Sequence, residues 1–284
     1  MRRLVVLGSV TGAPGVTTTG LALAAVWPEA DGGVRPVVVE ADASGGDLMI
    51  RFGLPSAPSL LDVAAAAGQQ YPGSLLGAAC ELPFGVRAVV AVPGRGPCRE
   101  AVRLLAGEGG RRVLLGDDHD RGTVLLDVGR LGEDVEPLLE GADQVVLVAR
   151  GGAEPLTHVS AYGFDACVYA GRLTLAVVGP CPYRAEEITK ALGIEQVSFL
   201  PWDAKGVTVM SSAHHGALRT DGFRPSPLMT AARKVARQLA VLPEEGAGAG
   251  TADGGCGSTG SAAPMVARSS TGLVRGPGVE ESGS

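Results

Sequence analysis

A glycine-rich turn near the amino terminus carries the clearest chemical signal in the sequence. An apolar run at residues 4–7 leads into the loop 8–15, and a helix-like segment follows from Val16. Such a turn exposes several backbone N–H groups at the positive end of a helix, which makes an anion site suited to phosphate. The hydroxyl of Thr17 or Thr18 would cap the helix or reach a magnesium ion. The simpler alternative is a capped turn that binds nothing.

Two nucleotide-binding motifs compete for this loop. The dinucleotide fingerprint G-x-G-x-x-G does not fit, because the glycines are Gly8, Gly12 and Gly15, although Glu40 would suit a ribose hydroxyl. The other motif is a P-loop, G-x-x-x-x-G-K-[ST]. The segment 12–18, with the sequence GAPGVTT, resembles the deviant Walker A motif of the ParA/MinD family, K-G-G-x-G-K-[ST]-T.

Four later segments resemble the same family in order and spacing. They are EADASGGDL at 40–48, LLD at 125–127, ADQVVLV at 142–148 and LPWD at 200–203. The apolar strand that closes on Asp127 is similar to a Walker B strand. The sequence from residue 2 to about 242 is therefore identified as a ParA/MinD-like P-loop chain.

The resemblance implies a role for each matching position. Asp42 would orient or activate the attacking water, and Thr17 and Asp127 would hold Mg²⁺. The cofactor would be Mg-ATP or Mg-ADP. The residues expected to contact the nucleotide are Thr11, Gly12, Ala13, Pro14, Gly15, Val16, Thr17, Thr18, Pro201 and Asp203.

The loop departs from the family at the positions of its lysines. Thr11 stands in place of the signature lysine, and Val16 in place of the phosphate lysine. Those lysines neutralise charge on the β- and γ-phosphates, so their absence weakens turnover more than binding. Arg130 and Arg150 follow apolar runs at the edge where α/β sheets bind ligands, and either could supply a cation. Solvated surface arginines are the alternative.

Short apolar runs of strand length alternate with helix-like segments along residues 1–242. This pattern predicts an α/β fold with a doubly wound, mostly parallel sheet and helices on both faces. The expected strands are 4–7, 36–40, 87–92, 123–127, 144–149, 173–178 and 197–200. The expected helices are 16–26, 59–67, 99–106, 135–139, 155–169, 185–192 and 227–242.

Composition sets the remaining bounds. Residues 243–284 are rich in Gly, Ala and Ser, which predicts a disordered tail after the domain 1–242. The five cysteines lack C-x-x-C spacing, and no stretch reaches the ~18 apolar residues of a membrane span. We therefore expect a cytoplasmic protein. The net charge of −6 gives no general attraction to nucleic acid.

Three functions are open at this stage. The first is a degenerate nucleotide-binding protein with little or no hydrolysis; the resemblance implies a positioning or assembly factor for chromosome or plasmid partitioning, septum placement, or a pilus or secretion system. The second is an active Mg-ATPase that uses an arginine in place of lysine. The third is a nucleotide-free adaptor whose tail contacts other proteins. The resemblance implies protein partners and a homodimer, whereas DNA or membrane binding has no support in the sequence.

Overall fold

The computed structural model describes residues 1–12, 14–28, 34–69, 75–82, 84–164, 166–211 and 226–241. Residues 1–243 form one compact unit. The predicted tail 243–284 and Ala13 of the glycine-rich loop lie outside the described residues. In the part of the chain that the structure describes, no helix is long and apolar enough to cross a bilayer.

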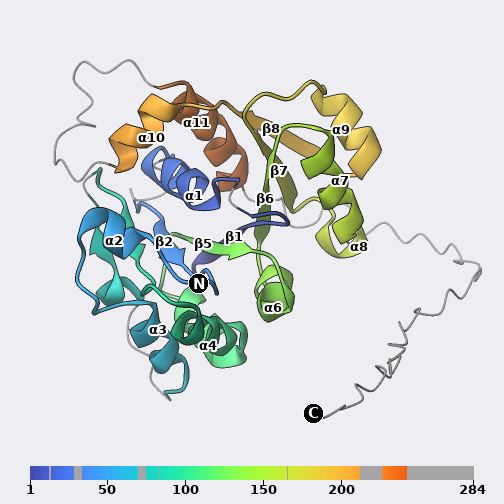
Figure 1. The fold of residues 1–284 in the computed structure, drawn as a ribbon. Helices are drawn as coiled ribbons and strands as arrows, with labels where there is room; N and C mark the ends of the chain where they lie inside the picture. Colours follow the sequence, from blue (N-terminus) through green and yellow to red (C-terminus); the bar gives the residue numbers. More distant parts are fainter. Residues whose placement is uncertain are drawn as a thin grey trace, which may run out of the picture. The chain divides into compact units, whose positions relative to one another are not determined.

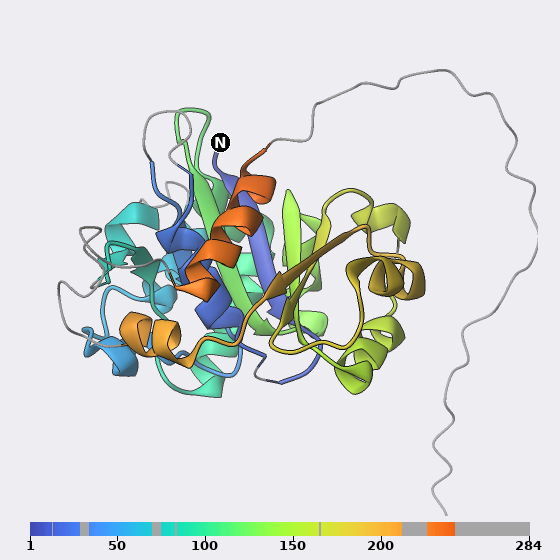
Figure 2. The ribbon, with the colours of Figure 1, turned by 90° about the horizontal axis from the view of Figure 1, so that it is seen from above.

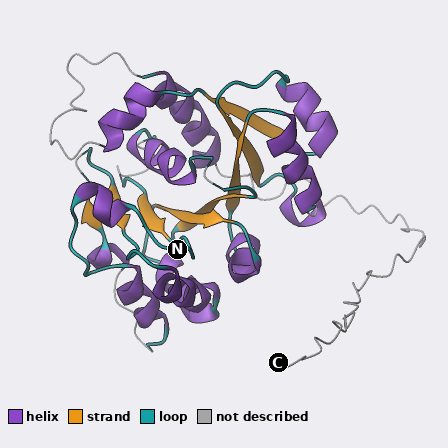
Figure 3. Ribbon diagram, viewed as in Figure 1, coloured by secondary structure: helices purple, strands orange, loops and turns teal. Residues whose placement is uncertain are grey.

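An eight-stranded sheet forms the centre of this unit (Figure 3). Its order is β3-β4-β2-β5-β1-β6-β7-β8, and only the β3–β4 pair is antiparallel. The strands are β1 (Arg3–Ser9), β2 (Val37–Glu40), β3 (Cys80–Glu81), β4 (Arg87–Val89), β5 (Thr123–Arg130), β6 (Gln144–Arg150), β7 (Leu173–Val178) and β8 (Gln196–Leu200). The predicted doubly wound, mostly parallel sheet is confirmed.

Helices cover both faces of the sheet (Figure 1). They are α1 (Val16–Ala25), α2 (Leu48–Phe52), α3 (Leu60–Ala67), α4 (Arg95–Ala106), α5 (Glu108–Leu115), α6 (Glu136–Glu140), α7 (Ala153–Tyr162), α8 (Ala166–Tyr169), α9 (Ala185–Leu192), α10 (Ala204–Ser211) and α11 (Pro227–Ala240). The described residues also include two 3₁₀ turns, Leu75–Ala78 and Glu133–Val135.

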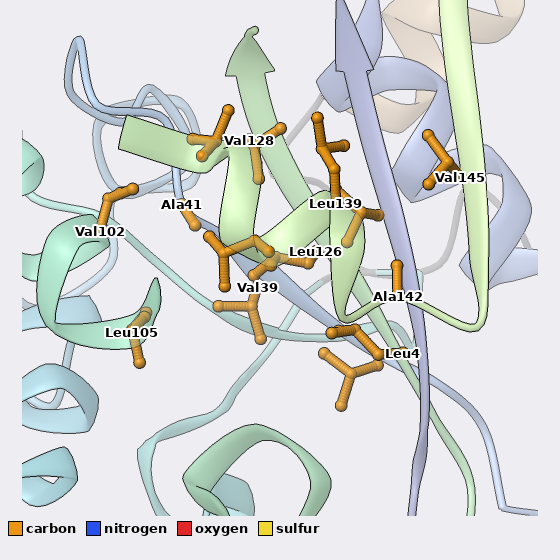
Figure 4. Packing of buried hydrophobic residues seen from close by; sticks show 14 of the residues in the cluster. Leu4, Val39, Ala41, Val102, Leu105, Leu126, Val128, Leu139, Ala142 and Val145 are labelled. Carbon is orange, nitrogen blue, oxygen red and sulfur yellow. The ribbon is translucent and has the colours of Figure 1, made fainter. Parts of the chain in front are cut away.

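Alternate residues of the central strand pack into two separate cores. Leu4 and Val6 of β1 join the core beneath α3 to α7 and α9, whereas Val5 and Leu7 join the core beneath α1, α2, α10 and α11. Figure 4 shows the first core, with Leu126 among side chains from neighbouring strands and helices. In Figure 2, α11 lies across the second face of the sheet. Burial on both faces explains why the strands are apolar throughout.

The structure departs from the expected elements in several places; α2, α10 and the short strand β3 were not expected. The segment 155–169, expected as one helix, is divided into α7 and α8 by Gly163, whose φ is +71°. Helix α5 was not expected, because Gly109 and Gly110 disfavour a helix. A Cβ on either glycine would collide with the Ala67 carbonyl or with Leu105, so close packing against α3 and α4 selects glycine there.

Candidate functional site

The glycine-rich loop joins the carboxyl end of β1 to the start of α1. Gly15 precedes the helix with φ +101°, a left-handed conformation that favours glycine. The first turn of α1 contains no acidic residue, and no side chain of the described residues caps it. Gly12 is exposed, and a Cβ built there meets no atom within 4 Å. Without a side-chain cap among the described residues, the N–H groups that begin the helix are suited to an anion.

Side chains at the start of α1 divide between the core and this loop. Val16 is only 6% exposed and packs in the core beneath α1, so its backbone alone can face a ligand. Thr17 and Thr18 are half-buried. Thr11 is also half-buried, and its carbonyl accepts a hydrogen bond from the Ser9 hydroxyl at 2.6 Å. No lysine side chain reaches this turn from the residues of the loop that the structure describes.

Asp127, in β5 beside β1, is 1% exposed. Burial raises its pKa to about 7, although Thr17 and the N–H of Gly129 oppose this shift, while the charges of Glu40 and Asp42 add to it. The N–H of Gly129 donates to Oδ1 at 3.0 Å. Oδ2 is buried and accepts no hydrogen bond from any described residue. A buried carboxylate oxygen without a donor is costly, which makes this atom the least satisfied acceptor of the site.

Glu40 ends β2 and lies opposite Asp127 in the sheet register. Its Oε1 accepts hydrogen bonds from the N–H groups of Asp47 at 2.8 Å and Leu48 at 3.1 Å, and its Oε2 accepts one from Ala91 at 2.9 Å. Burial raises the pKa of Glu40, and these three N–H groups oppose the shift. Glu40 therefore anchors a loop and does not face outward as a ribose ligand would.

Asp42 lies in the loop that Glu40 anchors. Its Oδ1 accepts a hydrogen bond from Ser44 N at 2.7 Å. A Cβ on Gly129 would collide with the Asp42 carboxylate, so the loop after β2 lies against the last residues of β5 there. Gly45 approaches the backbone of Gly94 at the start of α4. The predicted catalytic carboxylate thus lies beside β5, two residues after Asp127.

A cavity of about 350 Å³ opens next to the glycine-rich loop. Its lining brings together residues of that loop, the end of β6 and the segment after β8, and it includes Pro14, Gly15, Thr18, Arg150, Pro201, Trp202 and Asp203. The Arg150 guanidinium lies over the Trp202 ring, 5.3 Å from its centroid. Arg130 is exposed and is not among the residues that line the cavity.

Asp203 lines the cavity, but its carboxylate is engaged elsewhere. Oδ1 accepts a hydrogen bond from Gly206 N at 2.9 Å, and Oδ2 accepts one from Leu228 N at 3.3 Å. These N–H groups and the Ser226 hydroxyl hold the pKa of Asp203 below its usual range, led by Gly206. Asp203 therefore caps the first turns of α10 and α11, a role that sequence spacing did not indicate.

Solved structures resemble this arrangement over most of the chain. A ParA family ATPase from Chlorobium tepidum has a TM-score of 0.64 and 16% identity, covering 84% of this chain and 98% of that one. The chain has the fold of the ParA/MinD ATPases. A MinC:MinD cell division complex from Aquifex aeolicus gives 0.59 and 17%, with 84% and 95% covered. A cobyrinic acid a,c-diamide synthase from Mycobacterium smegmatis, with a bound ATP analogue and magnesium, gives 0.54 and 17%, with 84% and 94% covered.

Sequence comparison alone finds less. No protein-family model matches the chain, and no curated protein matches it. The ParA/MinD-like fold predicted from the motifs is thus confirmed through structure. Because the ParA/MinD fold also carries a diamide synthase, what this chain does must be argued from its own residues.

The residues around Asp127 fit a magnesium ion. Mg²⁺ binds oxygen ligands, retains several waters and uses one or two protein groups. The buried Oδ2 of Asp127 lacks a donor among the described residues, and the Thr17 side chain lies next to the carboxylate. No cluster of three or more His, Cys, Asp or Glu side chains suited to a metal occurs in the described ranges. A metal here would therefore depend on nucleotide phosphates for further ligands.

Proposed function

We propose that this chain binds a magnesium nucleotide at the carboxyl edge of the sheet and acts as a ParA/MinD-like positioning or assembly factor. The observation that carries the proposal is Asp127 Oδ2, a buried acceptor without a donor among the described residues, beside Thr17 at the glycine-rich loop. Bound Mg²⁺ would supply positive charge for that oxygen and for the phosphates. Thr17 and Asp127 would hold the ion.

The phosphates would be held mainly by backbone N–H groups. The contacting segment would be 11–18, with Gly12 leaving space and Gly15 turning the chain. Val16 is buried where the family motif has its lysine, so no side-chain cation stabilises developing phosphate charge from that position. We infer that binding is retained and that hydrolysis is slow or absent. Asp42 would orient water in any residual hydrolysis.

The biological role follows from the structural relatives by analogy. They include a ParA family ATPase and a MinD protein in complex with MinC. Chromosome or plasmid partitioning, septum placement and localisation of a pilus or secretion system are the candidate tasks. We propose a cytoplasmic protein with protein partners that forms a homodimer. Its nucleotide domain would span residues 1–242, and a tail would span residues 243–284.

One observation favours a second candidate, an active ATPase. Arg150 lines the same cavity as Gly15 and Thr18, so its guanidinium lies on the ligand side of the sheet. An arginine there could take over the charge of the missing lysine. Arg130 lacks this support, because it is exposed and does not line the cavity.

Calorimetric titration tests the proposal. We expect wild-type protein to bind ADP and ATP more tightly with Mg²⁺ than with a chelator. Asp127→Asn should remove most of the Mg²⁺ effect, whereas the exposed Asp118→Asn should retain it. No binding at millimolar nucleotide would reject the proposal. Hydrolysis that falls on both Asp42→Ala and Arg150→Ala would instead favour the active ATPase.

A further inference from the structure

The Arg150–Trp202 pair is a feature of the cavity wall that phosphate binding does not explain. Arg150 ends β6 and Trp202 follows β8, yet the guanidinium lies 5.3 Å from the centre of the indole. Both residues line the cavity. Trp202 is 62% exposed, although a large aromatic side chain would normally be covered in a folded domain. An exposed aromatic ring fixed beside a cavity is suited to stack on a planar ligand.

The rest of the wall is mostly apolar. Val178, Leu200, Val207 and Leu228 line it beside Pro201. Asp203, the carboxylate in the lining, already accepts hydrogen bonds from Gly206 and Leu228. Such a surface favours contact with the face of a ring over hydrogen bonding to its edge. Bases present a π-face whatever their edge pattern, and stacking on an aromatic side chain tolerates different bases.

The phosphate end of the same site is poor in side-chain charge. Val16 is buried in the core, and Thr11 is neutral, so the loop offers backbone N–H groups in place of lysine. Affinity in this site must therefore come disproportionately from the other end of the ligand. Arg150 strengthens that end, since a guanidinium over an indole holds the ring in place through a cation–π contact.

We propose that Trp202 is the affinity-determining residue of the nucleotide site, stacking on the base, so that the nucleoside end of the ligand outweighs the γ-phosphate. This inference rests on the proposed nucleotide binding. It follows that ATP and ADP bind with similar affinity and that adenine and guanine nucleotides are poorly distinguished. A protein with such a site responds to the presence of nucleotide more than to its phosphorylation state.

Titration of Mg-ATP, Mg-ADP, Mg-GDP and Mg-tripolyphosphate tests this inference. We expect the three nucleotides to bind within about threefold of one another, and tripolyphosphate at least tenfold more weakly. Trp202→Ala should lower affinity for each nucleotide about 10- to 100-fold and leave tripolyphosphate unchanged. Trp202→Phe, which keeps an aromatic face, should stay within about fivefold of wild type.

The second tryptophan offers a matched control. Trp27 follows α1 and packs against the core at the other end of that helix, so Trp27→Phe should leave binding unchanged. In the Trp27→Phe background the remaining indole reports on Trp202, and nucleotide should change its fluorescence whereas tripolyphosphate should not. Nucleotide binding that survives Trp202→Ala, or tripolyphosphate that binds as tightly as ATP, overturns the inference while the proposed function stands. If wild-type protein binds no nucleotide, both fail.

Discussion

Strands β2 and β5 carry two buried carboxylates, Glu40 and Asp127, that lie opposite each other in the sheet but differ in their hydrogen bonding. Glu40 accepts three backbone hydrogen bonds, from Asp47 and Leu48 at the start of α2 and from Ala91. Asp127 accepts one, from Gly129, and its Oδ2 has no donor among the described residues. The two carboxylates are therefore similarly buried but suited to different roles. Both carboxylate oxygens of Glu40 accept hydrogen bonds, which hold the segments after β2 and β4 in place. Asp127 instead keeps one oxygen, Oδ2, available to a ligand.

The largest effect in this comparison should follow loss of the saturated carboxylate. Glu40→Ala would leave three N–H groups without their acceptor, and we expect it to lower the free energy of unfolding by about 3–5 kcal/mol. Urea unfolding monitored by circular dichroism measures this. The exposed Glu195→Ala is the control and should stay within about 0.5 kcal/mol of wild type. A loss below ~1 kcal/mol for Glu40→Ala would mean that the three hydrogen bonds do not organise this edge.

Replacing Asp127 should have the opposite effect on the free energy of unfolding: the variant should be more stable than wild type. Its native pKa is about 7 and its unfolded value is near 3.8, so the native state holds the proton more tightly. The stability of the wild-type protein therefore declines as pH rises from about 4 to 7, and this penalty is complete above pH 7. Asp127→Asn carries no such charge. We expect the variant to be about 2–4 kcal/mol more stable than wild type at pH 8, and only about 1–2 kcal/mol more stable at pH 5.

Urea unfolding at pH 5 and pH 8, without Mg²⁺ or nucleotide, measures this difference. Asp118→Asn serves again as the matched control, because Asp118 is exposed. If the stability difference between Asp127→Asn and wild type is the same at both pH values, the native pKa of Asp127 is not raised by burial. Asp127 would then not be the destabilising counterpart of Glu40.

The sequence was sufficient for the fold because its strands are buried on both faces. Seven apolar runs corresponded to seven strands, and the order of motifs along them led to the ParA/MinD-like fold that structural comparison confirms. Elements whose formation depends on tertiary contacts were not predicted from the sequence. Helix α5 contains Gly109 and Gly110, which only close packing on α3 and α4 explains. The two-residue strand β3 is too short to show periodicity.

The candidate site was only partly predictable. Thr17 and Asp127 could be chosen from local motifs, and the structure brings them together, although their binding roles stay predictions. The function of Glu40 depends on Ala91, 51 residues away, which no local spacing indicates. The Arg150–Trp202 pair likewise joins the ends of two strands that are separated along the chain.

The smallest of the three effects tests how tightly Glu40 is enclosed. A Cβ on Gly46 would collide with the Glu40 carboxylate and would lie 2.7 Å from the Ala91 carbonyl oxygen. Gly46→Ala should therefore lower the free energy of unfolding by about 1–3 kcal/mol, measured by urea unfolding. Gly12→Ala is its matched control, because a Cβ there meets nothing within 4 Å, and it should change stability by less than ~1 kcal/mol. If both variants lose the same free energy of unfolding, the loop after β2 accommodates a Cβ as readily as the glycine-rich loop does. Glu40 would then not hold that loop rigidly.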